Sequence, residues 1–106
     1  LGQEDLIVDS LVRLAPVEPE TARQGLWILA MAAYDADAMD VAAHRFEKVL
    51  EVDPNRARAH YYLGLIYVSE EANEKARRHL QRFVELAPDD PEAATASELI
   101  TFLGKS

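Results

Sequence analysis

The side chains that most often perform chemistry in proteins are sparse in this sequence. Its three histidines are His44, His60 and His79; none lies in an HExxH motif, and no two are four residues apart. An isolated histidine lacks the partner groups that complete a set of metal ligands or a catalytic base. We therefore predict packing or surface roles for all three, and we expect neither a metal nor a cofactor.

Motifs for nucleophilic or phosphate chemistry are also missing. The sequence has no Cys, its four Gly form no phosphate-binding loop, and no Ser lies in a nucleophile elbow. Asp35, Asp37 and Asp40 resemble the start of a calcium loop, but the Gly and the closing Glu of such a loop are lacking. A solvated turn accounts for these three carboxylates, and the sequence predicts that the protein is not an enzyme.

One apolar stripe has the types and spacing of a binding surface. Trp27, Met31 and Tyr34 are spaced i, i+4, i+7, so they share one face of a helix. The same spacing recurs 34 residues later in Tyr61, Leu65 and Val68. It recurs again in Thr95, Leu99 and Phe102. Trp, Tyr and Met are enriched at the centres of protein interfaces, and large exposed apolar patches are rare without a function.

The elements that carry this stripe repeat with a period of 34 residues. The segment "FEKVLEVDPN" aligns without a gap with "LQRFVELAPD", so that Pro54 falls on Pro88. Each block has apolar residues at helical spacing in two runs, and its Pro ends the second helix. A small residue in each first helix, Ala30 or Gly64, allows a neighbouring helix to approach closely. We expect six helices, at residues 3–15, 20–35, 39–52, 56–69, 73–86 and 91–103, with Asp90 and Pro91 starting the last and Gly104 ending it.

The segment "HYYLGLIY…EKARRHLQRFVELAP" resembles a tetratricopeptide repeat, whose pattern is W-x2-L-G-x2-Y…A-x3-F…P. The matching residues are Leu63, Gly64, Tyr67, Ala76 and Pro88, and a weaker match in the preceding block runs through Leu29, Ala42, Phe46 and Pro54. The turns between paired helices lack the usual Gly. The resemblance implies an all-α, right-handed α-solenoid of helix-turn-helix repeats in a single domain, residues 1–106. Its parts are an N-terminal half-repeat helix and linker (1–22), repeat 1 (23–56), repeat 2 (57–90) and a capping helix (91–106).

The resemblance also implies a function, because the first helices of such repeats line a concave groove that binds a peptide or a helix. We predict non-enzymatic protein–protein interaction through an apolar and aromatic groove. Its residues are Trp27, Ile28, Met31, Tyr34, Tyr61, Tyr62, Leu65, Val68, Leu99 and Phe102. The alternative is a structural or self-association module, a homodimer for example, whose groove is filled by its own chain or by a second copy. Small domains of this kind occur in bacterial envelope assembly factors, a likeness of fold alone.

The charge and hydropathy of the chain limit the classes of partner that it is expected to bind. The formal net charge is -8, so nucleic acid is not expected as a partner. Residues 1–44 carry eight acidic against two basic side chains, which favours a basic partner at that end. No apolar run approaches the roughly 18 residues that a membrane span needs. The sequence starts at Leu1 without Met, so we expect a trimmed chain, and both cytoplasm and periplasm stay open.

Overall fold

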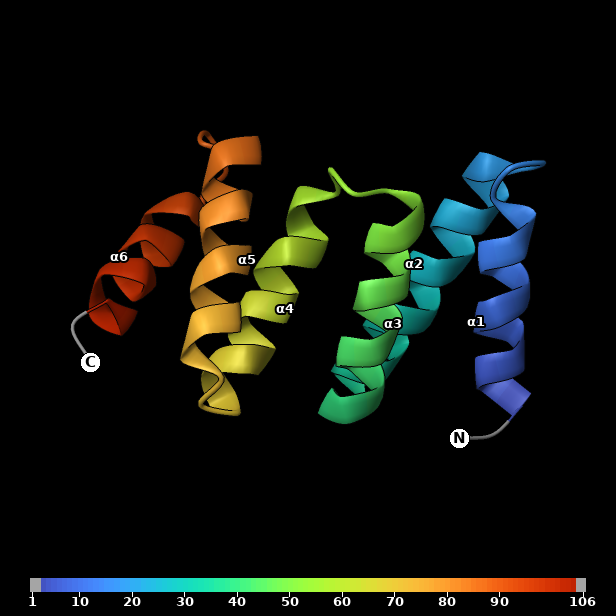
Figure 1. The fold of residues 1–106 in the computed structure, drawn as a ribbon, viewed down its shortest axis with the longest axis horizontal. Coiled ribbons are helices and arrows are strands. Elements are labelled where there is room, and N and C mark those ends of the chain that lie inside the picture. Colours follow the sequence, from blue (N-terminus) through green and yellow to red (C-terminus); the bar gives the residue numbers. More distant parts are fainter. Residues whose placement is uncertain (1–2, 105–106) are drawn as a thin grey trace. The chain divides into compact units, whose positions relative to one another are not determined.

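The computed structural model describes residues 3–104, in which all regular secondary structure is helical. The helices are α1 (Gln3–Leu14), α2 (Pro19–Asp35), α3 (Met39–Val52), α4 (Ala57–Ser69), α5 (Asn73–Leu86) and α6 (Ala93–Leu103) (Figure 1). The all-α, helix-turn-helix prediction is confirmed, and every helix begins and ends within two residues of its expected bounds. The chain divides into two compact units, Leu1–Pro54 with α1 to α3 and Asn55–Ser106 with α4 to α6. The solenoid arrangement and the single domain stay predictions.

Unit 1, Leu1–Pro54, is a helix pair with one further helix packed on it. Helices α2 and α3 pack against each other, and α1 contacts both of them. Val8 of α1, Leu26 of α2 and Phe46 of α3 are fully buried. The apolar stripes of the three helices therefore meet in one small core.

Unit 2, Asn55–Ser106, is a helix pair followed by a third helix. Helix α5 packs against α4 on one side and against α6 on the other. Its core contains the buried residues Tyr61, Ala76, Leu80, Phe83, Ala96 and Leu103. A Cβ atom placed on Gly64 would lie 2.6 Å from both Cγ and Cδ2 of Leu80. Gly64 therefore permits the close helix approach that the sequence predicts at this position.

The turns inside the two helix pairs have the same hydrogen bonds although neither contains Gly. In α2–α3 the amide of Ala38 donates to the carbonyl of Ala33, and in α4–α5 the amide of Ala72 donates to that of Tyr67, both at 2.9 Å. These six-to-one bonds, together with left-handed residues at Asp37 (φ 61°) and Glu71 (φ 60°), form Schellman motifs. The usual Gly is thus replaced by residues that adopt its backbone conformation.

The start of the last helix differs from the expectation. Helix α6 begins at Ala93, two residues later than predicted, because residues 91 and 92 form a turn. The Asp90 carboxylate accepts a hydrogen bond from the amide of Glu92 (2.9 Å), as a capping side chain does. Gly104 does end the helix as predicted, but its φ of −73° is right-handed, so its conformational freedom is not used there.

Candidate functional site

Helix α2 carries the part of the predicted stripe that belongs to unit 1. The Trp27 and Tyr34 rings both meet the buried Phe46 ring of α3 edge-on, with centroids 5.6 and 6.3 Å away. Both rings are half-buried, as is Met31, while Ile28 beside them is 63% exposed. Contact with Phe46 holds the two aromatic side chains in fixed positions, so ordering them would cost a partner little entropy.

Tyr61, the counterpart of Trp27 in unit 2, is placed differently. It is only 8% exposed, its ring centroid lies 4.9 Å from that of Phe83, and its hydroxyl donates to Oε2 of Glu92 (3.1 Å). The Arg58 guanidinium lies over the ring at 5.6 Å. Tyr61 therefore connects α4 with α5 and with the start of α6, and it has little surface left for a partner.

The other predicted residues of unit 2 keep some exposed surface. Tyr62, Leu65 and Val68 of α4 and Leu99 of α6 are half-buried and pack against the core of the unit. Phe102 of α6 is 70% exposed. The stripe is thus present in both units, and the groove that it would form stays a prediction.

A polar network at the junction of α4 and α6 was not foreseen from the sequence. Arg58 donates to Oδ1 of Asp90 at 2.9 Å, and this carboxylate also accepts the amide of Glu92. Together with the hydrogen bond from Tyr61 to Glu92, these contacts fix the turn before α6. The sequence did hold a clue to this network. Arg58 and Asp90 are 32 residues apart, which is about one repeat, and this spacing places them near the starts of α4 and α6.

Two of the three histidines also meet, which their separation in sequence did not indicate. Nδ1 of His60 and Nδ1 of His79 are 3.0 Å apart, and the Tyr67 ring lies beside His79 at 5.7 Å. The pKa of His79 is lowered from 6.5 to about 4, chiefly by burial and then by the charges of His60, Arg78 and Lys75. Among the side chains of residues 5–104 no three metal-binding groups come together, so in this part of the chain the pair lacks a third ligand.

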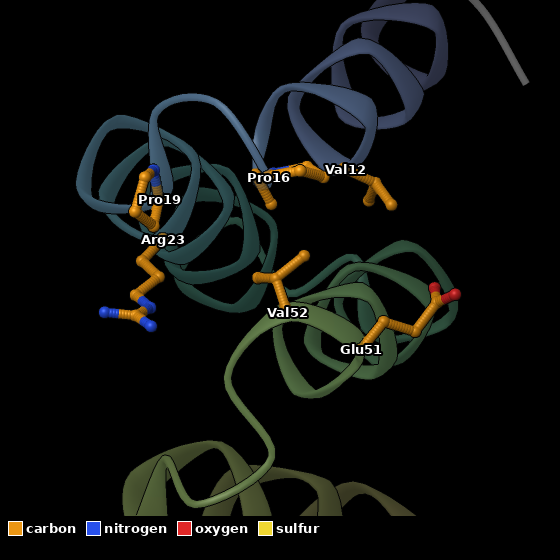
Figure 2. Close-up of a pocket in the computed structure, with 7 residues that line it drawn as sticks. Val12, Pro16, Pro19, Arg23, Glu51 and Val52 are labelled. Atoms are coloured by element: carbon orange, nitrogen blue, oxygen red, sulfur yellow. The ribbon is translucent and has the colours of Figure 1, made fainter.

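A hollow of about 380 Å³ lies in unit 1 where the end of α1, the start of α2 and the end of α3 meet (Figure 2). Val12, Pro16 and Val52 give it apolar walls, and none of its residues belongs to the predicted stripe. Its charged residues are engaged within their own helices, Arg23 with Glu20 at 3.0 Å and Glu51 with Lys48 at 2.9 Å. The hollow therefore has no group of convergent polar side chains that would orient a small ligand.

The three carboxylates of the turn between α2 and α3 lie at the surface of unit 1, and Asp37 and Asp40 border a second hollow there. Asp35, Asp37 and Asp40 are all exposed, and Asp37 supplies the left-handed residue of the turn.

None of the helices in the described part of the chain combines the length and the hydropathy that a membrane span requires.

A comparison with models of protein families identifies a family that this chain matches. The family model described as "Tetratricopeptide repeat" matches residues 29–91, which is more than half of the chain and runs from within α2 to the turn before α6. A search of curated proteins found no match.

Proposed function

The chain belongs to the tetratricopeptide repeat family, and from that premise we propose that it binds a peptide or a helix of another protein through the apolar stripe residues that α2 carries in unit 1 and that α4 and α6 carry in unit 2. Tetratricopeptide repeats are in general protein–protein interaction modules. The observation that carries the proposal is the pair of half-exposed rings, Trp27 and Tyr34, held by Phe46 with the exposed Ile28 beside them.

Binding in this proposal is driven by burial of apolar surface. The α2 stripe offers an indole, a phenol, a thioether and an aliphatic side chain, and Phe102 of α6 adds an exposed ring. Such residues supply most of the affinity in many interfaces when they lie at the centre. No Lys or Arg belongs to the predicted stripe, so affinity should change only modestly with salt.

Tyr61 has a supporting role in this proposal. Because its ring is buried against Phe83 and its hydroxyl is bonded to Glu92, it ties α4, the helix that carries Tyr62 and Leu65, to α5 and to the start of α6. Replacing it with Ala would disturb the unit itself. Ile28 and Phe102 are better test positions, because their exposed side chains contribute little to folding.

The test is capture of partners by the wild type and two variants, followed by calorimetric titration of the partner found. We expect Trp27→Ala to weaken binding by about 2 kcal/mol or more, as is usual for a central aromatic residue. Ile28→Glu should also weaken it without lowering the melting temperature. The same titration at low and high salt should give similar affinities.

The matched control is Arg78→Gln with Arg82→Gln, which removes two exposed charges from α5. This variant should bind as the wild type does. If it loses binding while Trp27→Ala and Ile28→Glu retain it, the outer face of α5 is the binding surface and the proposal is wrong.

A further inference from the structure

The apolar stripe of α2 has an acidic side chain at each of its ends. At about 100° per residue, Glu20 projects from the helix in a direction between those of Trp27 and Met31. By the same rotation Asp35 projects between Met31 and Ile28. Both carboxylates are exposed, and at about 1.5 Å per residue they are about 22 Å apart along the helix axis. Negative charge therefore flanks the stripe on its own face of the helix.

The stability of α2 does not account for Asp35. This residue is the last of the helix, where the helix dipole makes a carboxylate unfavourable. The repeat places Ser69 at the same position of unit 2, and its hydroxyl donates to the carbonyl of Ile66 at 2.6 Å. The charge is thus particular to unit 1, and a cation of a partner would offset its cost.

Few cations of the chain itself lie near these two ends. Asp37 and Asp40, both exposed, follow Asp35 in the turn after α2. The Glu20 carboxylate pairs with Arg23 at 3.0 Å, but the two side chains are 77% and 41% exposed, and such pairs are weak enough to be exchanged for a partner's charges. Residues 1–44 carry eight acidic against two basic side chains, which makes the field over this face negative.

We propose that the partner of the α2 stripe is a peptide segment with apolar side chains at its centre and Lys or Arg near both of its ends, an inference that rests on the proposed function. The centre of the segment covers Trp27, Ile28 and Met31, and its cations lie beside Glu20 and Asp35. An extended segment spans about 22 Å with about seven residues, and a helical one with about 15. Exposed ion pairs change an equilibrium by about fivefold or less each, so the charges select the partner while apolar burial supplies most of the affinity.

Selection from a phage-displayed library of random peptides of about 16 residues tests the proposal, because this length suffices for either conformation. Only peptides whose binding is lost with Trp27→Ala are counted, or with Ile28→Ser if the first variant does not fold. These peptides should be enriched in Lys and Arg and depleted in Asp and Glu relative to the starting library. In calorimetric titrations, replacing their basic residues with Gln should raise the Kd about three- to twentyfold.

Reversing the two charges of the helix face should reverse this preference. Glu20→Lys with Asp35→Lys should select acidic peptides, and it should bind the peptides of the wild type at least about tenfold more weakly. The matched control is Glu70→Lys with Asp89→Lys, which changes the net charge equally at two exposed sites of unit 2 and should keep the preference of the wild type. Melting curves establish that each variant is folded. If the reversed variant does not fold, Glu20→Gln with Asp35→Asn replaces it and should lose the preference.

The possible failures are distinguishable. Peptides that depend on Trp27 but are not enriched in Lys and Arg overturn the basic partner and leave the proposed function in place. A preference that the control variant loses as fully as the reversed variant does also overturns it, because net charge alone would then select the peptides. A library without any peptide that depends on Trp27 or Ile28 overturns the proposed function, and the basic partner with it.

Discussion

The two helix pairs α2–α3 and α4–α5 carry different side chains at the same two positions of the repeat. The repeat places Leu26 and Arg45 of unit 1 at the positions of His60 and His79 in unit 2. In unit 1 the buried Arg45 guanidinium donates to the carbonyl of Leu29 at 2.9 Å. In unit 2 the two imidazoles meet each other at 3.0 Å. The same two positions of the repeat therefore hold a guanidinium bonded to a backbone carbonyl in unit 1 and two imidazole rings in contact in unit 2.

The two helix pairs differ in whether the side chain at this position changes its charge when the pH is lowered. A guanidinium keeps its charge at every pH at which proteins fold. The His79 imidazole, with a pKa of about 4 in the fold, can be protonated by acid. The same tertiary position is therefore insensitive to pH in one unit and sensitive in the other.

The largest expected effect concerns the small residue at the helix crossing, Ala30 in unit 1 and Gly64 in unit 2. Gly64→Leu should lower the free energy of unfolding by about 3 kcal/mol, because even a Cβ atom there would collide with Leu80. Urea denaturation of the variant and the wild type measures this. Gly104→Leu is the control, since Gly104 is exposed and its φ suits any residue. An unchanged midpoint for Gly64→Leu would contradict the close approach.

The acid response of the histidine pair is expected to be smaller. Between pH 6.5 and about 4 the unfolded chain binds a proton at His79 that the folded chain does not, so stability should fall as the pH falls through this window. The groups around this ring are His60 and Tyr67 of α4 and Lys75 and Arg78 of α5. Because solvent screens the partly exposed ring, we expect a loss of about 1–2 kcal/mol, measured by urea denaturation at each pH.

Transplanting the polar pair of unit 1 into unit 2 sharpens that comparison. The double variant His60→Leu with His79→Arg should fold, because it recreates the Leu26 and Arg45 arrangement. Its stability should fall less than that of the wild type between pH 6.5 and 4. If the variant and the wild type lose the same stability over that range, the pH dependence originates elsewhere in the chain.

The smallest effect is expected at the two Gly-free turns. Glu71→Gly should stabilise the protein by about 0.5–1 kcal/mol, because a left-handed backbone strains every residue with a Cβ atom. Asp37→Gly should have an effect close to zero, since Asp tolerates this conformation better than Glu does. Thermal melting compares the two variants. A larger gain at Asp37 than at Glu71 would show that strain does not distinguish the turns.

The elements of the fold were predictable because their signals are local and repeated. Helical spacing of apolar residues and the 34-residue period placed all six helices, and Pro54 and Pro88 follow closely after α3 and α5 as expected. The prediction for the start of α6 was wrong by two residues because of the contacts that the Asp90 side chain makes. The Asp90 carboxylate receives both Arg58 and the amide of Glu92, which holds residues 91 and 92 in a turn.

The sequence by itself determined the family, the helices and the small residue at the crossing, since each depends on spacing along one chain. The tertiary structure decided the burial of individual side chains. Tyr61 shares the register of Trp27, yet it is buried because Phe83 and Glu92 enclose it. The meeting of His60 with His79 likewise required two helices to be placed against each other. Periodicity fixes which side of a helix a residue occupies, whereas burial depends on neighbours that only the packed unit supplies.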